Sequence, residues 1–213
     1  DGPPDWALRS PTDDPTQPPL DLEAWGEFCG AVAERYQGRI AGYQIWNEPN
    51  LDREWFGLPP NPQGYVNLLR ACSSAIRAAD PDAVIISAGL APTGNWLPDA
   101  IPDVDYLRML YDAGFSAYFD VLGVHAPGYG SPPEMSPEEA EAVRGHRWMA
   151  FRHVEDMRAI MVEEGDAAKQ VALLEVGWTT DTREGSDYAW HAVTPEKQSE
   201  YLVGAYQWAA DHW

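Results

Sequence analysis

Two glutamates in this chain follow strongly apolar segments and have similar neighbours. Glu48 stands between Asn47 and a proline in QIWNEPN, and Glu175 is soon followed by a glycine and Trp178 in VALLEVGWTTD. Proline removes a backbone donor and disfavours helical geometry in the residue before it, so Glu48 marks the point where a strand stops and a loop begins. A carboxylate at such a rim can transfer a proton or act as a nucleophile.

Two such carboxyl groups in one sugar-sized pocket would suffice to cleave a glycosidic bond. One group must give a proton to the leaving oxygen, while the other is ionised and attacks the anomeric carbon. Unequal burial and mutual repulsion allow one group to stay protonated near neutral pH while the other is ionised. Glu48 and Glu175 are far apart in the sequence, so only tertiary structure could bring them together. The alternative is that each glutamate ends its strand by chance, as a helix cap or an ion-pair partner.

The amino-acid composition argues against some classes of binding partner and favours others. The chain has 34 acidic and 14 basic residues among 213, a formal charge of −20, which argues against nucleic acid and anionic membranes. Its ten Trp and ten Tyr residues suit stacking on sugar faces, although cores and interfaces also use aromatic residues. No hydrophobic segment of about 20 residues and no signal peptide is present, so we expect no membrane insertion, and an export signal would lie outside this sequence.

Cysteines and histidines give little sign of a metal or redox site. Cys29 and Cys72 each lie in a helical pattern, which favours two buried thiols over a disulfide. The common metal-binding and phosphate-binding motifs do not occur, and the five histidines are scattered. We therefore expect neither a metal nor a cofactor.

Four apolar segments alternate with helical patterns along the chain. Residues 1–20 contain six prolines and are predicted to form an extended loop, in which PDWALRS could end a strand. The predicted strands are 39–50, 83–90, 119–126 and 170–178. The predicted helices are 22–36, 61–80, 103–114, 136–140, 151–165 and 194–213. The helix boundaries are marked by Asn61-Pro62, Ser136-Pro137 with Glu139, Thr194-Pro195 and Gly114.

This alternation predicts an α/β fold in one domain, with a parallel sheet and right-handed crossovers. The strands are near-continuous apolar runs, as expected when both faces of a sheet are covered. A closed barrel and an open doubly wound sheet share the pattern. Polar residues at the strand ends favour the barrel, because active sites of (β/α)8 barrels lie at that face, whereas open sheets usually show a phosphate-binding glycine turn. The polar residues are Asn47, Glu48, Ser87, His125 and Glu175.

Three segments, IWNEPN, DVLGVHAPGYG and LLEVGW, resemble the clan of retaining (β/α)8 glycoside hydrolases, and are most similar to bacterial members near families 39 and 5. In that clan the acid/base follows an Asn at the end of strand four, and the nucleophile Glu ends strand seven. The resemblance implies a partial TIM barrel, in which residues 1–213 supply about strands four to seven with their helices and lack the first strands and the last. A half barrel has two bare edges, so the missing segments or a partner chain would have to cover them.

The resemblance also assigns roles to residues at the strand ends. Glu48 would be the general acid/base and Glu175 the nucleophile, while Asn47 would hydrogen-bond the sugar 2-hydroxyl. His125 would line the pocket and orient the nucleophile, or would be an ordinary buried histidine under a loop.

Aromatic residues near these positions complete the predicted site. Trp46 and Trp178 flank the glutamates and would stack on sugars or pack the strand ends. Related sequences often have His-Pro-Tyr where this one has His125-Ala126-Pro127, so Tyr129 stands two positions later than their tyrosine.

The leading hypothesis is a hydrolase that cleaves β-linked sugars of plant or microbial polysaccharide by double displacement, with an extracellular or cell-surface location favoured. The alternative is a non-catalytic carbohydrate-binding or assembly protein on a degenerate barrel. Sugar, linkage and oligomeric state depend on the rim loops, which we expect at residues 50–60, 91–102, 126–147 and 179–193.

Overall fold

The structure is a computed structural model that describes residues 16–96 and 98–213. The chain divides into two compact units, and each is described by itself. Unit 1 consists of Asp1–Gly123 and Ile160–Ala172, and unit 2 of Val124–Ala159 and Leu173–Trp213. Most of the proline-rich segment, including the predicted strand end PDWALRS, lies outside the described residues.

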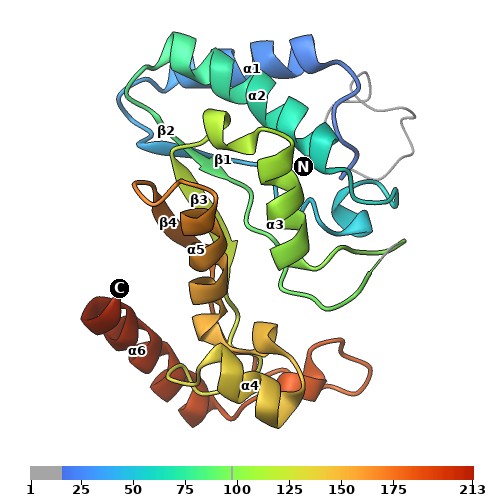
Figure 1. The fold of residues 1–213 in the computed structure, drawn as a ribbon, viewed down its shortest axis with the longest axis vertical. Helices are drawn as coiled ribbons and strands as arrows, with labels where there is room; N and C mark the ends of the chain where they lie inside the picture. The colour runs from blue at the N-terminus through green and yellow to red at the C-terminus, as the bar shows by residue number, and fades with distance from the viewer. Residues whose placement is uncertain (1–15, 97) are drawn as a thin grey trace. The chain divides into compact units, whose positions relative to one another are not determined.

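Four short strands form one sheet in the order β1-β2-β3-β4 (Figure 1). Their bounds are Gly42–Ile45 for β1, Val84–Ser87 for β2, Val121–His125 for β3 and Gln170–Glu175 for β4. β1 runs parallel to β2, and β2 runs parallel to β3. The predicted α/β class with a parallel sheet is therefore confirmed.

Six α-helices alternate with these strands: α1 Leu22–Arg35, α2 Pro62–Ala79, α3 Asp103–Asp112, α4 Pro137–Arg144, α5 Val154–Glu163 and α6 Pro195–His212. The predicted caps are present, because a cap depends only on residues within one turn. Ser136 accepts from the backbone N–H of Glu139 at 3.2 Å, and the Glu139 carboxylate accepts from the N–H of Ser136 at 2.8 Å. The segment 151–153 at the start of the predicted fifth helix is a 3-10 turn rather than α-helix.

The core of unit 1 is formed by α2 and α3 and by residues of the strands and loops beside them. Its fully buried side chains include Tyr65, Leu68, Leu69, Ile76, Ile85, Leu107, Phe115 and Phe119. α1 and α2 lie side by side (Figure 1). A Cβ added to Gly30 of α1 would stand 3.5 Å from the Cβ of Ala75 on α2, which is an ordinary van der Waals contact.

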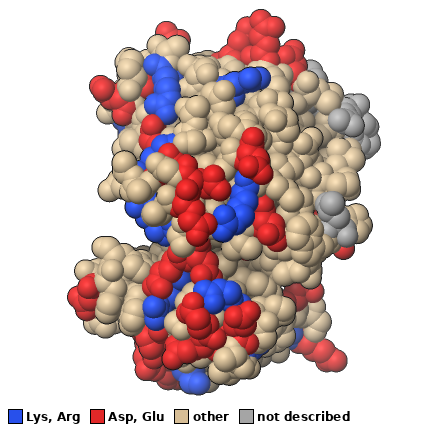
Figure 2. All heavy atoms as spheres, viewed as in Figure 1, with Lys and Arg blue, Asp and Glu red and all other residues tan. Residues whose placement is uncertain are grey.

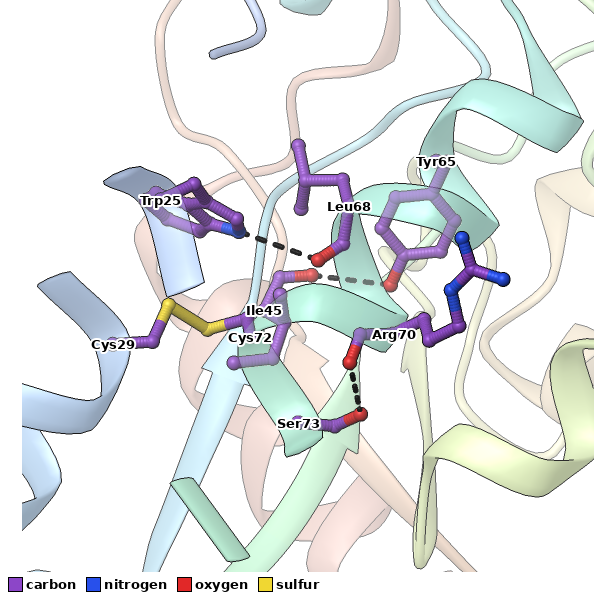
Figure 3. The surroundings of a disulfide bond; sticks show 8 residues. All are labelled: Trp25, Cys29, Ile45, Tyr65, Leu68, Arg70, Cys72 and Ser73. Carbon is purple, nitrogen blue, oxygen red and sulfur yellow. Dashed lines mark hydrogen bonds between the residues drawn. A yellow bond between two sulfur atoms is a disulfide. The ribbon is translucent and has the colours of Figure 1, made fainter. Parts of the chain in front are cut away.

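A disulfide joins Cys29 of α1 to Cys72 of α2 (Figure 3), so the prediction of two free thiols was wrong. The two Cα atoms are 5.3 Å apart, and the residues are 4% and 2% exposed. Periodicity correctly put each cysteine on the buried face of its helix, but it does not indicate that these two faces pack together. Disulfides persist mainly in oxidising compartments, so this bond supports the expectation of an extracellular location.

Two other expectations about burial need correction. The apolar spacing of helix 22–36 would place Phe28 on its inner face, but Phe28 is 58% exposed and stacks on Trp25 at 5.7 Å between ring centroids. β4 was expected to be covered on both faces, yet its four middle residues are only half-buried and its two end residues are exposed. β4 stands last in the strand order, and a strand at an edge has a neighbour on one side only.

Unit 2 has its own buried residues, among them Phe151, Val154 and Met157. Asp156 organises the polar groups beside them. Its carboxylate accepts from both Nε and an Nη atom of Arg147, at 3.1 and 2.6 Å, and lies 3.0 Å from Nδ1 of His153. Burial alone would raise the pKa of Asp156, but the hydrogen bonds from His153 and Arg147 outweigh it and hold this pKa below its usual value.

Acidic side chains are spread over the face shown in Figure 2, with basic side chains beside many of them. Some of the acidic residues form ion pairs, such as that of Glu163 with Arg108 at 2.9 Å, while the formal net charge stays at −20. Among the described residues, none of the helices is both long enough and apolar enough to cross a bilayer.

Loss of the disulfide should destabilise the protein. The bond closes a loop with a sequence separation of 43 residues. Closing a loop of that length is worth about 4 kcal/mol in the chain-entropy account, so we expect Cys29→Ala/Cys72→Ala to lower the free energy of unfolding by about 2–4 kcal/mol. Urea titration of this variant against wild type checks the effect. Two reactive thiols in the denatured, unreduced wild type would contradict the disulfide.

Asp156→Asn should destabilise the protein in a pH-dependent way. We expect a loss of about 2 kcal/mol at pH 7, because the charged hydrogen bonds to Arg147 and His153 weaken. A carboxyl group whose pKa is lowered by folding stabilises the protein above its unfolded pKa and loses that effect as the pH falls through the folded pKa. The difference from wild type should therefore shrink below about pH 3.9. Urea titrations at several pH values measure it, with the exposed Asp211→Asn as control; a pH-independent difference would refute the assignment.

Candidate active site

The chain leaves β1 through a strained turn that carries Glu48. Trp46 has φ 74° and Glu48 has φ 39°, both in the left-handed region that residues other than glycine seldom adopt. Such conformations cost about 1–3 kcal/mol each and persist where the surroundings enforce them, often at functional sites. The backbone N–H of Glu48 donates to the carbonyl of Gly89 at 3.0 Å, which ties the turn to the segment after β2.

Asn50, two residues after Glu48, helps to hold this turn in place through its side chain. Its side chain is fully buried and bridges two other segments of unit 1. The amide nitrogen donates to the carbonyls of Ala91 at 2.9 Å and Ile101 at 3.0 Å, and the amide oxygen accepts from the N–H of Ala91 at 2.9 Å. Every hydrogen bond of this side chain goes to backbone, so it fixes the course of the chain rather than another side chain.

Tyr65 of α2 joins β1 and β2 by hydrogen bonds at the same end of the strands. Its buried hydroxyl donates to the carbonyl of Ile45, the last residue of β1, at 3.1 Å and accepts from the N–H of Ala88 just after β2 at 2.7 Å. Burial raises the pKa of the Tyr65 hydroxyl above its usual value, so the proton stays available for the bond to Ile45. The exits of β1 and β2 are thereby held together.

The side chains on this turn differ in accessibility. Glu48 is 9% exposed, and one carboxylate oxygen lies 2.8 Å from a guanidinium nitrogen of Arg53, whose side chain is 64% exposed. Asn47 is half-buried. Trp46 donates from Nε1 to the carbonyl of Glu54 at 3.1 Å and packs edge-on against Trp55. The indole of Trp46 is therefore fixed by protein contacts and only partly open.

In unit 2, His125 and Glu175 end β3 and β4. Nδ1 of His125 lies 3.7 Å from a carboxylate oxygen of Glu175. The imidazole is 2% exposed, whereas the Glu175 side chain is 61% exposed. A buried histidine beside an open carboxylate can orient that carboxylate while leaving its other oxygen free to react.

The loops that follow these two strands stay paired. The N–H of Ala126 donates to the carbonyl of Glu175 at 2.9 Å, and the N–H of Gly128 donates to the carbonyl of Gly177 at 3.1 Å. Trp178 lies over Gly128 so closely that a Cβ there would stand 1.9 Å from the indole. The indole is 4% exposed and donates to the carbonyl of Ser131 at 2.8 Å, so we assign Trp178 to packing rather than to sugar stacking.

Two further predicted residues have other surroundings than expected. Ser87 is buried in unit 1, where its hydroxyl accepts from the N–H of Gly123 at 2.9 Å, a structural contact within the sheet. Tyr129 has φ 49° and places its ring against Trp148, Trp190 and His191.

The structure thus brings Asn47 and Glu48 together on one turn, and His125 and Glu175 together at two neighbouring strand ends. Sequence reasoning missed Asn50 and Tyr65, which hold the turn, and Arg53, which pairs with Glu48. Asn50 could have been noticed, because it belongs to the same NEPN segment. Tyr65 carries no such signal, since it looks like any other apolar position of its helix.

Several proteins of known structure resemble this chain in fold. The chain matches no known sequence family and no curated protein. Among solved structures it is similar to a family 39 glycoside hydrolase from Bacteroides cellulosilyticus WH2, with TM-score 0.60 and 21% identity over 92% of this chain and 36% of that one. It is also similar to a glucosidase from Croceicoccus marinus, with TM-score 0.59 and 15% identity over 89% and 36% of the two chains. A GH128 endo-β-1,3-glucanase from Sorangium cellulosum gives TM-score 0.55 and 18% identity over 86% and 59%.

These likenesses confirm the predicted fold, part of the barrel found in glycoside hydrolases. This chain spans about a third of the length of the first two structures and three fifths of the third. At these identities the likeness concerns the fold alone, and the chemistry has to be argued from the side chains.

Asn50→Ala should destabilise unit 1 strongly. The change leaves the N–H of Ala91 and the carbonyls of Ala91 and Ile101 buried without their partner, which we expect to cost about 3 kcal/mol. Urea titration measures the loss. Asn95→Ala, at an exposed asparagine of the same unit, is the matched control and should change stability by less than about 0.5 kcal/mol. Equal stability of the two variants would show that Asn50 does not hold the turn.

Proposed function

We propose that this chain is the catalytic part of a retaining glycoside hydrolase that acts on β-linked sugars, with Glu175 as nucleophile and Glu48 as general acid/base. The observation that carries the proposal is the Glu175 carboxylate, open to solvent at the end of β4 and 3.7 Å from the buried imidazole of His125. A fold shared with glycoside hydrolases and a second glutamate on a strained strand exit support it.

In the proposed first step, a Glu175 oxygen attacks the anomeric carbon and forms a glycosyl ester, while the bond to the leaving oxygen breaks and that oxygen takes the proton of Glu48. In the second step, Glu48 takes a proton from water, whose oxygen attacks the anomeric carbon and releases Glu175. Each step inverts the anomeric centre, so the β configuration is retained. Asn47 would bind the sugar 2-hydroxyl, and His125 would act as a positioning residue for Glu175.

Arg53 affects how this cycle begins. A guanidinium at 2.8 Å favours the ionised carboxylate, whereas a general acid must carry a proton. The Arg53 side chain is mostly exposed, so the ion pair is weak and an entering sugar can displace it. The same ion pair favours the second candidate function, a carbohydrate-binding protein without turnover, in which Glu48 would stay ionised.

The proposed enzyme has further barrel strands at both edges of the sheet and acts outside the cell. β1 and β4 are the ends of the strand order, and a bare edge invites pairing with another chain. Strands from elsewhere in the polypeptide, or from a partner chain, would cover both edges. The disulfide between α1 and α2 supports secretion or display at the cell surface, where polysaccharide substrates are found.

The full-length protein should hydrolyse nitrophenyl β-glycosides and lose activity when either glutamate is changed. We expect Glu175→Ala and Glu48→Ala to lower kcat/KM by about 10³-fold or more, whereas Glu27→Ala, at an exposed position of α1, should be unaffected. Azide separates the two roles. It should rescue Glu175→Ala as the α-glycosyl azide, with inverted configuration, and Glu48→Ala as the β-glycosyl azide, with retained configuration.

Product configuration is read by NMR. Undiminished activity in either variant would refute its role, and binding of sugars without turnover by wild type would favour the second candidate.

A further inference from the structure

Four rings pack together in unit 2, and we call them the aromatic cluster: Tyr129, Trp148, Trp190 and His191. Tyr129 stacks on Trp190, with ring centroids 5.8 Å apart and planes 22° apart. It meets Trp148 and His191 edge-on at 4.9 and 5.2 Å. Sequence reasoning identified only Tyr129, because the other rings come from segments that the chain brings together in three dimensions.

The aromatic cluster belongs to loops that continue from the candidate catalytic residues. Tyr129 follows β3 four positions after His125, in the segment whose Gly128 pairs with Gly177 after Glu175. Trp190 and His191 lie on the 3-10 turn Ala189–His191, later in the loop that follows β4. The two loops that carry the cluster therefore begin at the ends of the strands that carry His125 and Glu175.

The cluster exposes flat apolar surface. Trp190 is 56% exposed and its neighbour Tyr188 is 58% exposed. Burial, and the charge of Arg144, lower the pKa of His191, so this ring is neutral at pH 7. Around the rings, Trp148 Nε1, His191 Nδ1 and Arg144 Nε have no hydrogen-bond partner within the described part of the chain. Buried nitrogens without a hydrogen-bond partner are uncommon in a well-packed core, and a core would also cover the face of Trp190.

The cluster is also held firmly. In the loop after β4, Asp181 accepts from Nε and an Nη atom of Arg183 at 2.8 and 2.7 Å and from the Ser186 hydroxyl at 2.8 Å. The N–H of Val193 donates to the carbonyl of Thr179 at 2.9 Å and closes the base of the loop. Because the rings are fixed before a ligand arrives, binding costs little ordering entropy.

We propose that the aromatic cluster is a sugar-binding subsite, with Trp190 as its open platform, for a pyranose unit of a β-linked gluco-oligosaccharide. A pyranose whose hydroxyls are equatorial presents its axial C–H bonds as an apolar face, which matches an exposed indole. This inference rests on the proposed function only in that the loops of the cluster continue from the strands that carry His125 and Glu175, and its binding role can be tested without turnover.

The test measures binding of cellotetraose and laminaritetraose by calorimetry in a Glu175→Gln background, so that hydrolysis does not interfere. Trp190→Ala should weaken binding of one or both sugars about five- to tenfold, the range of one aromatic contact. Trp190→Phe keeps a flat ring and should retain affinity within about twofold. Tyr206→Ala removes a 78% exposed aromatic of α6 and is the matched control that should not change affinity.

The outcomes separate this inference from the proposed function. Equal affinity of Trp190→Ala and the Tyr206→Ala control, or no binding by any form, would overturn the subsite even if wild type hydrolyses glycosides. Binding that depends on Trp190, in a protein whose wild type turns over no glycoside, would sustain the subsite and reject the hydrolase. Loss of affinity in Trp190→Ala with recovery in Trp190→Phe also excludes misfolding as the cause.

Discussion

The turn after β1 exists because buried hydrogen bonds outweigh its backbone strain. Trp46 and Glu48 both adopt left-handed φ angles, which residues other than glycine seldom adopt. The amide of Asn50 and the hydroxyl of Tyr65 together satisfy five backbone groups from the exits of β1 and β2 and from the segment at Ile101. The backbone that carries Glu48 is thus held in place by Asn50 and Tyr65, which bond only to backbone groups.

In unit 2, backbone hydrogen bonds and one buried indole hold the segments after β3 and β4 together. Beyond β3 and β4 the two loops remain hydrogen-bonded, and Trp178 fills the space above Gly128. The buried indole of Trp178 packs between these loops, while Trp190 of the aromatic cluster remains 56% exposed. Trp178 and Trp190 therefore differ in accessibility, because Trp178 packs against Gly128 whereas Trp190 faces solvent.

Local patterns were predicted well, and partners across the fold were not. The caps at Asn61, Ser136 and Thr194 are present because each needs only the next three residues. The pairing of Cys29 with Cys72 was missed, since it depends on how α1 packs on α2. The exposure of β4 was missed for a related reason. The sequence of an apolar strand does not indicate whether neighbouring elements cover its faces.

The sequence by itself determined the alternation of strands and helices, and with it the parallel sheet and the strand-end positions of Glu48, His125 and Glu175. These follow from periodicity, proline and capping, which act within a few residues. Only the tertiary structure decided what surrounds each of these side chains: Arg53 beside Glu48, His125 beside Glu175, and Tyr129 among the rings of distant loops. Such contacts join residues whose separation along the chain carries no signal, because packing and hydrogen bonding act through space.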